Sequence, residues 1–336
     1  MPPSAGSSTV LFDSVRGHAR QKERLLAALE AGRLPHALLL TGPGGVGKKL
    51  MAEALAQGLF CSAASGRPCG ACPGCRKTAA SNHPDLVRVS VDPETKSRTI
   101  SLEQVRELSE SLSRTPGEGG CRVVIIDDAD RMTGDAQSAF LKTLEEPMGP
   151  TFFILVTSDP GRLMPTILSR CQTLRFGALG QTDAEDILLE EEGISPREAS
   201  DYARLSQGSI EEAFLLRDGG YREVVDAAFE LALLSLERSP VAWPEVSTGR
   251  DELLLLADAL IRVYRDVLLL SAAGETCRLF FADRTEELGR LAAAIDADRA
   301  QEVLEALCDA RDRLLSYVNP RLVSAQLLFD LGIRLV

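Results

Sequence analysis

One short segment limits the possible folds of this chain more than any other. Residues 42–49 read Gly-Pro-Gly-Gly-Val-Gly-Lys-Lys, which fits the phosphate-binding pattern GxxxxGK except at its last position, where Ser or Thr is usual. An apolar run at 37–40 precedes the segment, and a helical pattern at 50–60 follows it. Glycines let backbone amides curl around a polyphosphate, and the amino end of a helix favours negative charge. The segment therefore predicts an α/β domain with a phosphate loop.

The two lysines of this loop have different consequences for a bound nucleotide. Lys48 would reach the outer phosphates. Lys49 stands where a hydroxyl normally holds Mg²⁺, and an ammonium cannot coordinate a cation. ATP or ADP is thus a candidate ligand, with a weakened Mg²⁺ site. The candidate ligands in the loop are Gly42, Gly44, Gly45, Gly47, Lys48 and Lys49.

A second acidic segment has the pattern of the metal-binding half of such a site. The apolar run 122–126 ends in Asp127-Asp128-Ala129-Asp130. Asp127 would lie beside the metal, and Asp128 would polarise the attacking water. The second position is usually Glu, and Asp128 is one methylene shorter, which shortens its reach to the water. The two segments together predict a nucleotide site with two departures from a competent one.

The distribution of apolar runs divides the chain. Further strand-like runs at 86–91 and 152–156, separated by helical patterns, predict a parallel sheet covered by helices on both faces. Beyond residue 182 only helical spacing remains, for example at 251–270 and 302–315. Glycine-containing breaks near 177–180 and 218–220 give the boundaries. The predicted domains are an α/β domain at 1–177, a helical domain at 178–219 and a second helical domain at 220–336.

Four of the 8 cysteines form a cluster at 61–75. Their spacing is that of a Cys₄ zinc site, and prolines and glycines between them allow tight turns. Four thiolates leave no open coordination position, so the predicted zinc is structural. Free thiols or a redox pair are the alternatives. The predicted ligands are Cys61, Cys69, Cys72 and Cys75.

The charge and hydropathy of the chain exclude several functions. A formal net charge of -12 argues against independent tight binding to DNA, which usually needs a basic face. No run approaches the 18 or so apolar residues of a membrane span. Residues 1–8 lack the basic start and the apolar stretch that a secretion signal would have. A cytoplasmic location is expected.

Several further motifs follow the phosphate loop and the cysteines in a fixed order. They are Asn82-His83-Pro84-Asp85, the run Ala-Phe-Leu-Lys-Thr-Leu-Glu-Glu-Pro at 139–147, Thr157-Ser158-Asp159-Pro160, Pro165-Thr166-Ile167-Leu168-Ser169-Arg170-Cys171 and Val318-Asn319-Pro320-Arg321-Leu322. Together they resemble the clamp-loader branch of the AAA+ ATPases, chiefly over residues 11–177. The resemblance implies an AAA+ domain with a zinc knuckle, then an all-α lid and an all-α collar.

The resemblance also implies roles for two residues and a set of partners. Arg170, in the Ser-Arg-Cys motif, would be an arginine finger offered in trans to the ATP of the next subunit. Thr157 would stand at the sensor 1 position beside the nucleotide. The collar would join clamp-loader delta and gamma/tau subunits in a hetero-pentamer, which meets the sliding clamp and primed DNA; no membrane is implied.

Within this branch the sequence resembles the delta-prime type more than the gamma/tau motor type. Lys49 replaces the Mg²⁺-binding hydroxyl, and Glu211 stands about where motors carry a sensor 2 arginine. The His83-Pro84-Asp85 triplet also looks like the delta-prime version. We therefore expect no independent ATPase activity, with a motor ATPase subunit as the alternative. A self-contained AAA+ helicase and a zinc-stabilised binding module without nucleotide chemistry are the rivals from other classes.

Overall fold

The computed structural model describes residues 12–91, 98–113, 115–118, 120–147, 149–218, 220–237, 249–273, 279–316 and 318–333. The amino-terminal segment 1–8 lies outside these residues. The chain forms two compact units, Met1–Glu212 and Ala213–Val336. The finer division into three domains, with boundaries at 177 and 219, stays a prediction.

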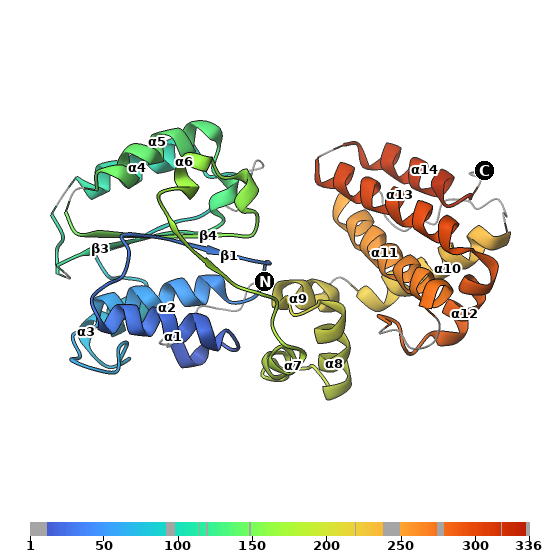
Figure 1. The fold of residues 1–336 in the computed structure, drawn as a ribbon, viewed down its shortest axis with the longest axis horizontal. Coiled ribbons are helices and arrows are strands. Elements are labelled where there is room, and N and C mark those ends of the chain that lie inside the picture. The colour runs from blue at the N-terminus through green and yellow to red at the C-terminus, as the bar shows by residue number, and fades with distance from the viewer. Residues whose placement is uncertain are drawn as a thin grey trace. The chain divides into compact units, whose positions relative to one another are not determined.

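The first unit is built on a five-stranded sheet in the order β2-β3-β4-β1-β5, whose paired strands are all parallel (Figure 1). The predicted parallel sheet is therefore confirmed. The strands are β1 (Ala37–Thr41), β2 (Leu86–Val89), β3 (Arg122–Ile126), β4 (Thr151–Thr157) and β5 (Gln172–Arg175). Because β4 lies between β1 and β3, the segments that follow these three strands meet at one edge of the sheet.

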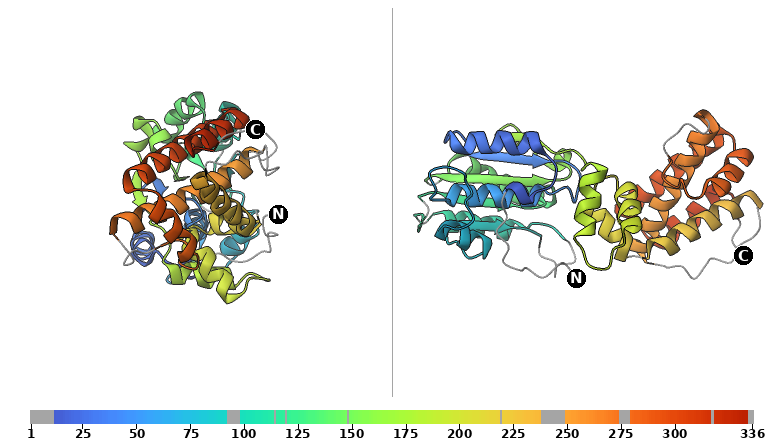
Figure 2. Two further views of the ribbon diagram at one scale, coloured as in Figure 1. Left: turned by 90° about the vertical axis from the view of Figure 1, so that its right-hand side faces the viewer. Right: turned by 90° about the horizontal axis from the view of Figure 1, so that it is seen from below.

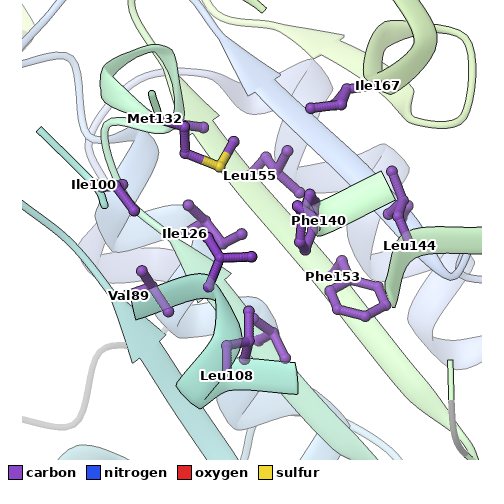
Figure 3. Close-up of a cluster of buried hydrophobic side chains, with 14 of the residues drawn as sticks. Val89, Ile100, Leu108, Ile126, Met132, Phe140, Leu144, Phe153, Leu155 and Ile167 are labelled. Carbon is purple, nitrogen blue, oxygen red and sulfur yellow. The ribbon is translucent and has the colours of Figure 1, made fainter. Parts of the chain in front are cut away.

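Helices cover both faces of this sheet, with α1–α3 on one side and α4–α6 on the other (Figure 1). Their bounds are α1 (Ala19–Glu30), α2 (Lys48–Phe60), α3 (Pro73–Ala79), α4 (Leu102–Leu112), α5 (Gly134–Glu145) and α6 (Pro165–Leu168), with short 3₁₀ turns η1 (Phe12–Ser14), η2 (Ala129–Arg131) and η3 (Pro160–Arg162). Beneath α4–α6 lies a buried cluster in which the rings of Phe140 and Phe153 meet edge to face at 5.5 Å (Figure 3). This core supports α5 and α6, which carry part of the site.

The described residues beyond Phe176 are helical, as the sequence pattern predicts. The first of these helices are α7 (Gln181–Leu189), α8 (Pro196–Leu205) and α9 (Ile210–Asp218). Ser195 and Glu198 form a reciprocal capping box that starts α8, and Pro196 occupies its first turn, where no backbone donor is needed. Helices α7 and α8 pack against each other.

After the end of α9, the described residues of the second unit form a bundle of five helices, in which α11 packs against α10, α12 and α13 (Figure 2). The helices are α10 (Tyr221–Glu237), α11 (Arg250–Ala273), α12 (Thr285–Ala294), α13 (Ala297–Leu315) and α14 (Pro320–Asp330). Asp266 is fully buried in this bundle but accepts the Phe281 N–H at 2.9 Å and pairs with Arg265 at 3.0 Å. Across the described part of the chain, no helix is both long and apolar enough to cross a membrane.

Candidate functional site

The phosphate loop joins β1 to α2, as predicted. Gly42 has φ 149°, and a Cβ at that position would lie 2.2 Å from the carbonyl oxygen of Phe176, so only glycine fits. Lys48 is 6% exposed, and its ammonium donates hydrogen bonds to the carbonyls of Gly42, at 2.7 Å, and Pro43. Burial lowers the pKa of Lys48, against the opposing charges of Glu211 and Asp127. The loop has the shape of a phosphate cradle, with its lysine folded back onto it.

The start of α9 lies directly on the phosphate loop. The Ile210 N–H donates to the Gly45 carbonyl at 3.0 Å, and a Cβ at Gly45 would lie 2.3 Å from the Glu211 nitrogen. A Cβ at Gly44 would lie 2.9 Å from Oε2 of Glu211. The carboxylate of Glu211 therefore lies beside the loop. By the resemblance to clamp loaders, a motor subunit would carry an arginine at about this position. The negative charge of Glu211 disfavours a second anion there.

Lys49 and Asp127, both predicted at the nucleotide site, are brought together in an ion pair. The Lys49 ammonium lies 2.8 Å from Oδ2 of Asp127, whose side chain is 19% exposed. Burial alone would lower the pKa of Lys49, but the hydrogen bond and charge of Asp127 outweigh it and raise the pKa. A charged ammonium thus engages the carboxylate that would otherwise approach a metal. With no hydroxyl at position 49 either, these residues do not fit a Mg²⁺–nucleotide complex.

The other acidic residues after β3 have separate positions. Asp128 has φ 52° and a 53% exposed side chain, and burial followed by the charge of Asp127 raises its pKa. Asp130, which the sequence reasoning did not single out, is buried and accepts a 2.5 Å hydrogen bond from the Thr157 hydroxyl. It also accepts the Ser158 N–H at 3.2 Å. Asp130 thereby joins the ends of β3 and β4 and fixes the predicted sensor residue Thr157.

Arg170 follows α6 and has its own set of partners. Its Nη2 lies 2.5 Å from Oε1 of Glu145, and its Nη1 donates to the Thr166 carbonyl at 2.9 Å and the Ser169 hydroxyl at 3.3 Å. The side chain is still 38% exposed. None of these partners belongs to the phosphate loop. The structure therefore groups the predicted loop and acidic residues together and places Arg170 in a different cluster.

A buried glutamine that the sequence reasoning missed holds α6 on α5. Gln137 of α5 is 4% exposed, and its amide nitrogen donates to the carbonyls of Met132, at 3.2 Å, and Arg162, at 3.1 Å. Its Oε1 accepts the Met164 N–H at 2.7 Å. Ile167 of α6 adds an apolar contact in the cluster of Figure 3. We call Gln137, Glu145, Thr166, Ser169 and Arg170 the α5–α6 platform.

The four predicted cysteines converge at the end of α2. All four Sγ atoms lie within 4.8 Å of one another, with Cys69 and Cys75 at 4.0 Å and Cys61 and Cys72 at 3.9 Å. A tetrahedral zinc with bonds of about 2.3 Å needs sulfurs roughly 3.8 Å apart. The arrangement is close to that geometry, so the cluster could hold zinc.

Local backbone geometry favours a thiolate at Cys72, whereas burial raises the pKa of Cys75. The backbone N–H groups of Cys69, Cys72 and Cys75 each donate to a cysteine sulfur at 3.4 Å. Burial alone would raise the pKa of Cys72, but hydrogen bonds from the Cys75 and Ser62 backbone lower it to about 6. His83 is not part of the cluster. Its ring is buried, stacks on Phe60 at 3.7 Å and accepts the Asp85 N–H at 3.2 Å.

The comparisons with known proteins identify the family. Residues 17–180 match the family model described as "DNA polymerase III, delta subunit". The chain is 32% identical to the DNA polymerase III subunit delta' of Bacillus subtilis, over 89% of this chain and 92% of that protein. It is also 32% identical to the delta' subunit of Escherichia coli, over 91% of each chain. The chain belongs to the DNA polymerase III delta-prime subunits.

The comparisons also distinguish the delta-prime prediction from the alternative of a motor ATPase subunit. The DNA polymerase III subunit tau of Escherichia coli is 36% identical, but over 62% of this chain and 32% of that protein. The two delta-prime relatives match almost the whole chain, including most of the second unit. The delta-prime prediction is therefore confirmed, and the motor alternative has less support.

Proposed function

We propose that this chain is the stator of a clamp loader: it offers Arg170 to the ATPase site of a neighbouring motor subunit and does not hydrolyse ATP at its own phosphate loop. The ion pair between Lys49 and Asp127 carries the proposal. In a hydrolytic P-loop site, Mg²⁺ lies between a loop hydroxyl and the acidic residue after β3, and bridges phosphate oxygens. Here the ammonium of Lys49 replaces the hydroxyl and forms an ion pair with Asp127. Neither of the two usual protein ligands is then available to Mg²⁺.

The position of Arg170 supports the other half of the proposal. A guanidinium spreads positive charge over the oxygens of a transferring phosphoryl group, and arginines supplied in trans contribute about 10³–10⁵ in rate. Such a group acts best when it is already oriented before the reaction. Arg170 is exposed and has three acceptors that hold it, Glu145, Thr166 and Ser169. It is therefore organised and accessible to a neighbouring subunit.

Assembly into a hetero-pentamer with delta and gamma/tau subunits completes the proposal. The second unit would act as the collar, and the ring would bring the chain to the sliding clamp and primed DNA in the cytoplasm. Large apolar side chains exposed on the last two helices are consistent with such packing. They are Leu315 (58% exposed), Leu322 (68%) and Phe329 (75%).

The cysteine cluster is proposed to hold one structural zinc. Its four sulfurs would complete the coordination shell, so the metal would stabilise the segment between α2 and α3 and take no part in hydrolysis.

The experiment is DNA-stimulated ATP hydrolysis by the clamp loader assembled from this chain and its own delta and motor subunits. We expect the isolated chain to be inactive, and Arg170→Ala to slow hydrolysis at the adjacent motor site on the order of 10³-fold without preventing assembly. Arg33→Ala is the matched control, because Arg33 is an exposed arginine that precedes β1, at the opposite edge of the sheet from the phosphate loop. Unimpaired hydrolysis with Arg170→Ala would refute the donor role.

The motor alternative has its own signature in the same experiment. Substantial ATPase activity of the isolated chain, lost on substitution of Lys48, would make the chain a motor. It would also show that the pair of Lys49 and Asp127 opens when nucleotide arrives.

A further inference from the structure

Among the three acceptors that hold Arg170, Glu145 is the one that comes from a different helix. It is the last residue of α5, where the helix dipole favours cations and disfavours a carboxylate. The side chain is 46% exposed, so solvent could satisfy it without a partner. Instead it lies 2.5 Å from Nη2 of Arg170. The position of this acid is unfavourable for α5 alone and is compensated by the arginine.

Within the described part of the chain, the contacts of Arg170 engage both Nη atoms of its guanidinium and leave its Nε–H available. Nη1 bonds to the Thr166 carbonyl and the Ser169 hydroxyl, and Nη2 to Glu145. The Nε–H has no partner among the described residues. Thr166 and Ser169 belong to the same short segment as Arg170 and can only bend its side chain back. Glu145 comes from another helix, so its contact is the one that fixes the direction of the guanidinium relative to the domain.

We infer that Glu145 is a positioning residue: it orients the Arg170 guanidinium before the neighbouring subunit's nucleotide arrives. This inference rests on the proposed function. A long arginine side chain has many rotamers, and restricting them in advance removes an entropic cost from the hydrolysis step. The negative charge of Glu145 also weakens the field of the guanidinium. Because both groups are more than one-third exposed, solvent screens that loss, and orientation is the larger effect.

The rest of the α5–α6 platform supplies the rigid base that such orientation needs. Gln137 bonds to the backbone on both sides of Leu163, and Ile167 is fully buried. The two ends of the contact between α5 and α6 are thus fixed, by Gln137 at one end and by the pair of Glu145 and Arg170 at the other. Removing Glu145 should free the arginine without releasing α6.

The test is a double-mutant cycle in the assembled clamp loader, with Glu145→Ala, Arg170→Ala and both together. We expect Glu145→Ala to lower the turnover number of the adjacent motor site about tenfold, leave its KM for ATP unchanged, and add no loss in the Arg170→Ala background. Glu145→Gln, which keeps an acceptor but not the charge, should recover part of the rate. Glu146→Ala is the matched control, because Glu146 is the adjacent exposed acid at the end of the same helix.

The outcomes separate this inference from the proposed function. If Arg170→Ala has no effect, the donor role itself fails. If Arg170→Ala slows hydrolysis but Glu145→Ala leaves it unchanged or accelerates it, the positioning role alone is wrong. A loss of equal size in the Arg170→Ala background would show that Glu145 acts independently of the arginine and would contradict the positioning role.

Discussion

The phosphate loop and the α5–α6 platform lie in the same unit, and both hold a cation against a carboxylate. At the loop, Lys49 pairs with Asp127, whose side chain is 19% exposed. Without Lys49, this carboxylate would be available to a metal ion. On the platform, Arg170 pairs with Glu145 but stays 38% exposed, with part of its guanidinium free of partners among the described residues. Under the proposed function, the first ion pair occupies groups that hydrolysis would need, and the second orients an arginine for a neighbouring site.

Under the proposed function, a nucleotide-binding fold has a new role and keeps its parallel-sheet architecture. Because parallel strands deliver their carboxyl ends to one edge, the loop after β1 and the acids after β3 still meet. Because Lys49 stands in place of a hydroxyl, the contact between these two segments is an ion pair with Asp127. The helices on the far face are unaffected, since their support comes from their own core (Figure 3).

The largest expected effect is on the stability of the cysteine cluster, and it should leave the α5–α6 platform unchanged. Cys75→Ser removes a fully buried sulfur from the cluster. Since a structural zinc contributes on the order of 10 kcal/mol to folding, we expect zinc content to fall from one per chain and the ends of α2 and α3 to unfold locally. Hydrogen exchange should rise there and stay slow in α5. Cys121→Ser, outside the cluster, is the control. A wild-type protein that contains no zinc when purified reduced and without chelator would contradict the assignment.

A smaller loss of stability is expected when the α5–α6 platform is weakened and the phosphate loop is left unchanged. Gln137→Ala leaves the Met164 N–H and two carbonyls without their side-chain partner, which should reduce the free energy of unfolding by about 1–3 kcal/mol. Chemical denaturation measures this change. Ser138→Ala, at the neighbouring exposed position, should change it by less than about 0.5 kcal/mol. Equal effects of the two substitutions would mean that Gln137 does not hold α6.

The smallest effect on stability is expected at the loop. Lys49→Thr breaks an ion pair whose lysine is 61% exposed, so the free energy of unfolding should change by less than about 1 kcal/mol. Magnesium-dependent binding of a fluorescent ATP analogue should nevertheless rise, because a hydroxyl returns and Asp127 is released. Lys77→Thr, which breaks the exposed pair with Glu118, is the control. Wild-type protein that binds Mg²⁺–ATP as tightly as the variant would contradict the role given to Lys49.

The sequence predicts the features that depend on local pattern. Strands β1, β3 and β4 follow from apolar runs, β2 from a run of β-branched residues interrupted by Arg88, and the cysteine cluster from spacing within one segment. Strand β5 has no such signal, because it lies at the sheet edge and only Leu174 of its four residues is buried. The pairs of Asp130 with Thr157 and Glu145 with Arg170 join residues far apart in the chain. No spacing rule links such residues, so these contacts needed the folded structure.

The most direct test of the account compares one variant at each region in the same assembled clamp loader. Pre-steady-state ATP hydrolysis would be measured with Lys48→Met, which keeps the volume of the buried side chain, and with Arg170→Ala. The account predicts that Lys48→Met leaves the amplitude of the fast phase unchanged and that Arg170→Ala reduces it. The reverse result, with the fast phase dependent on Lys48 and indifferent to Arg170, would show that this chain hydrolyses ATP itself and is not the stator.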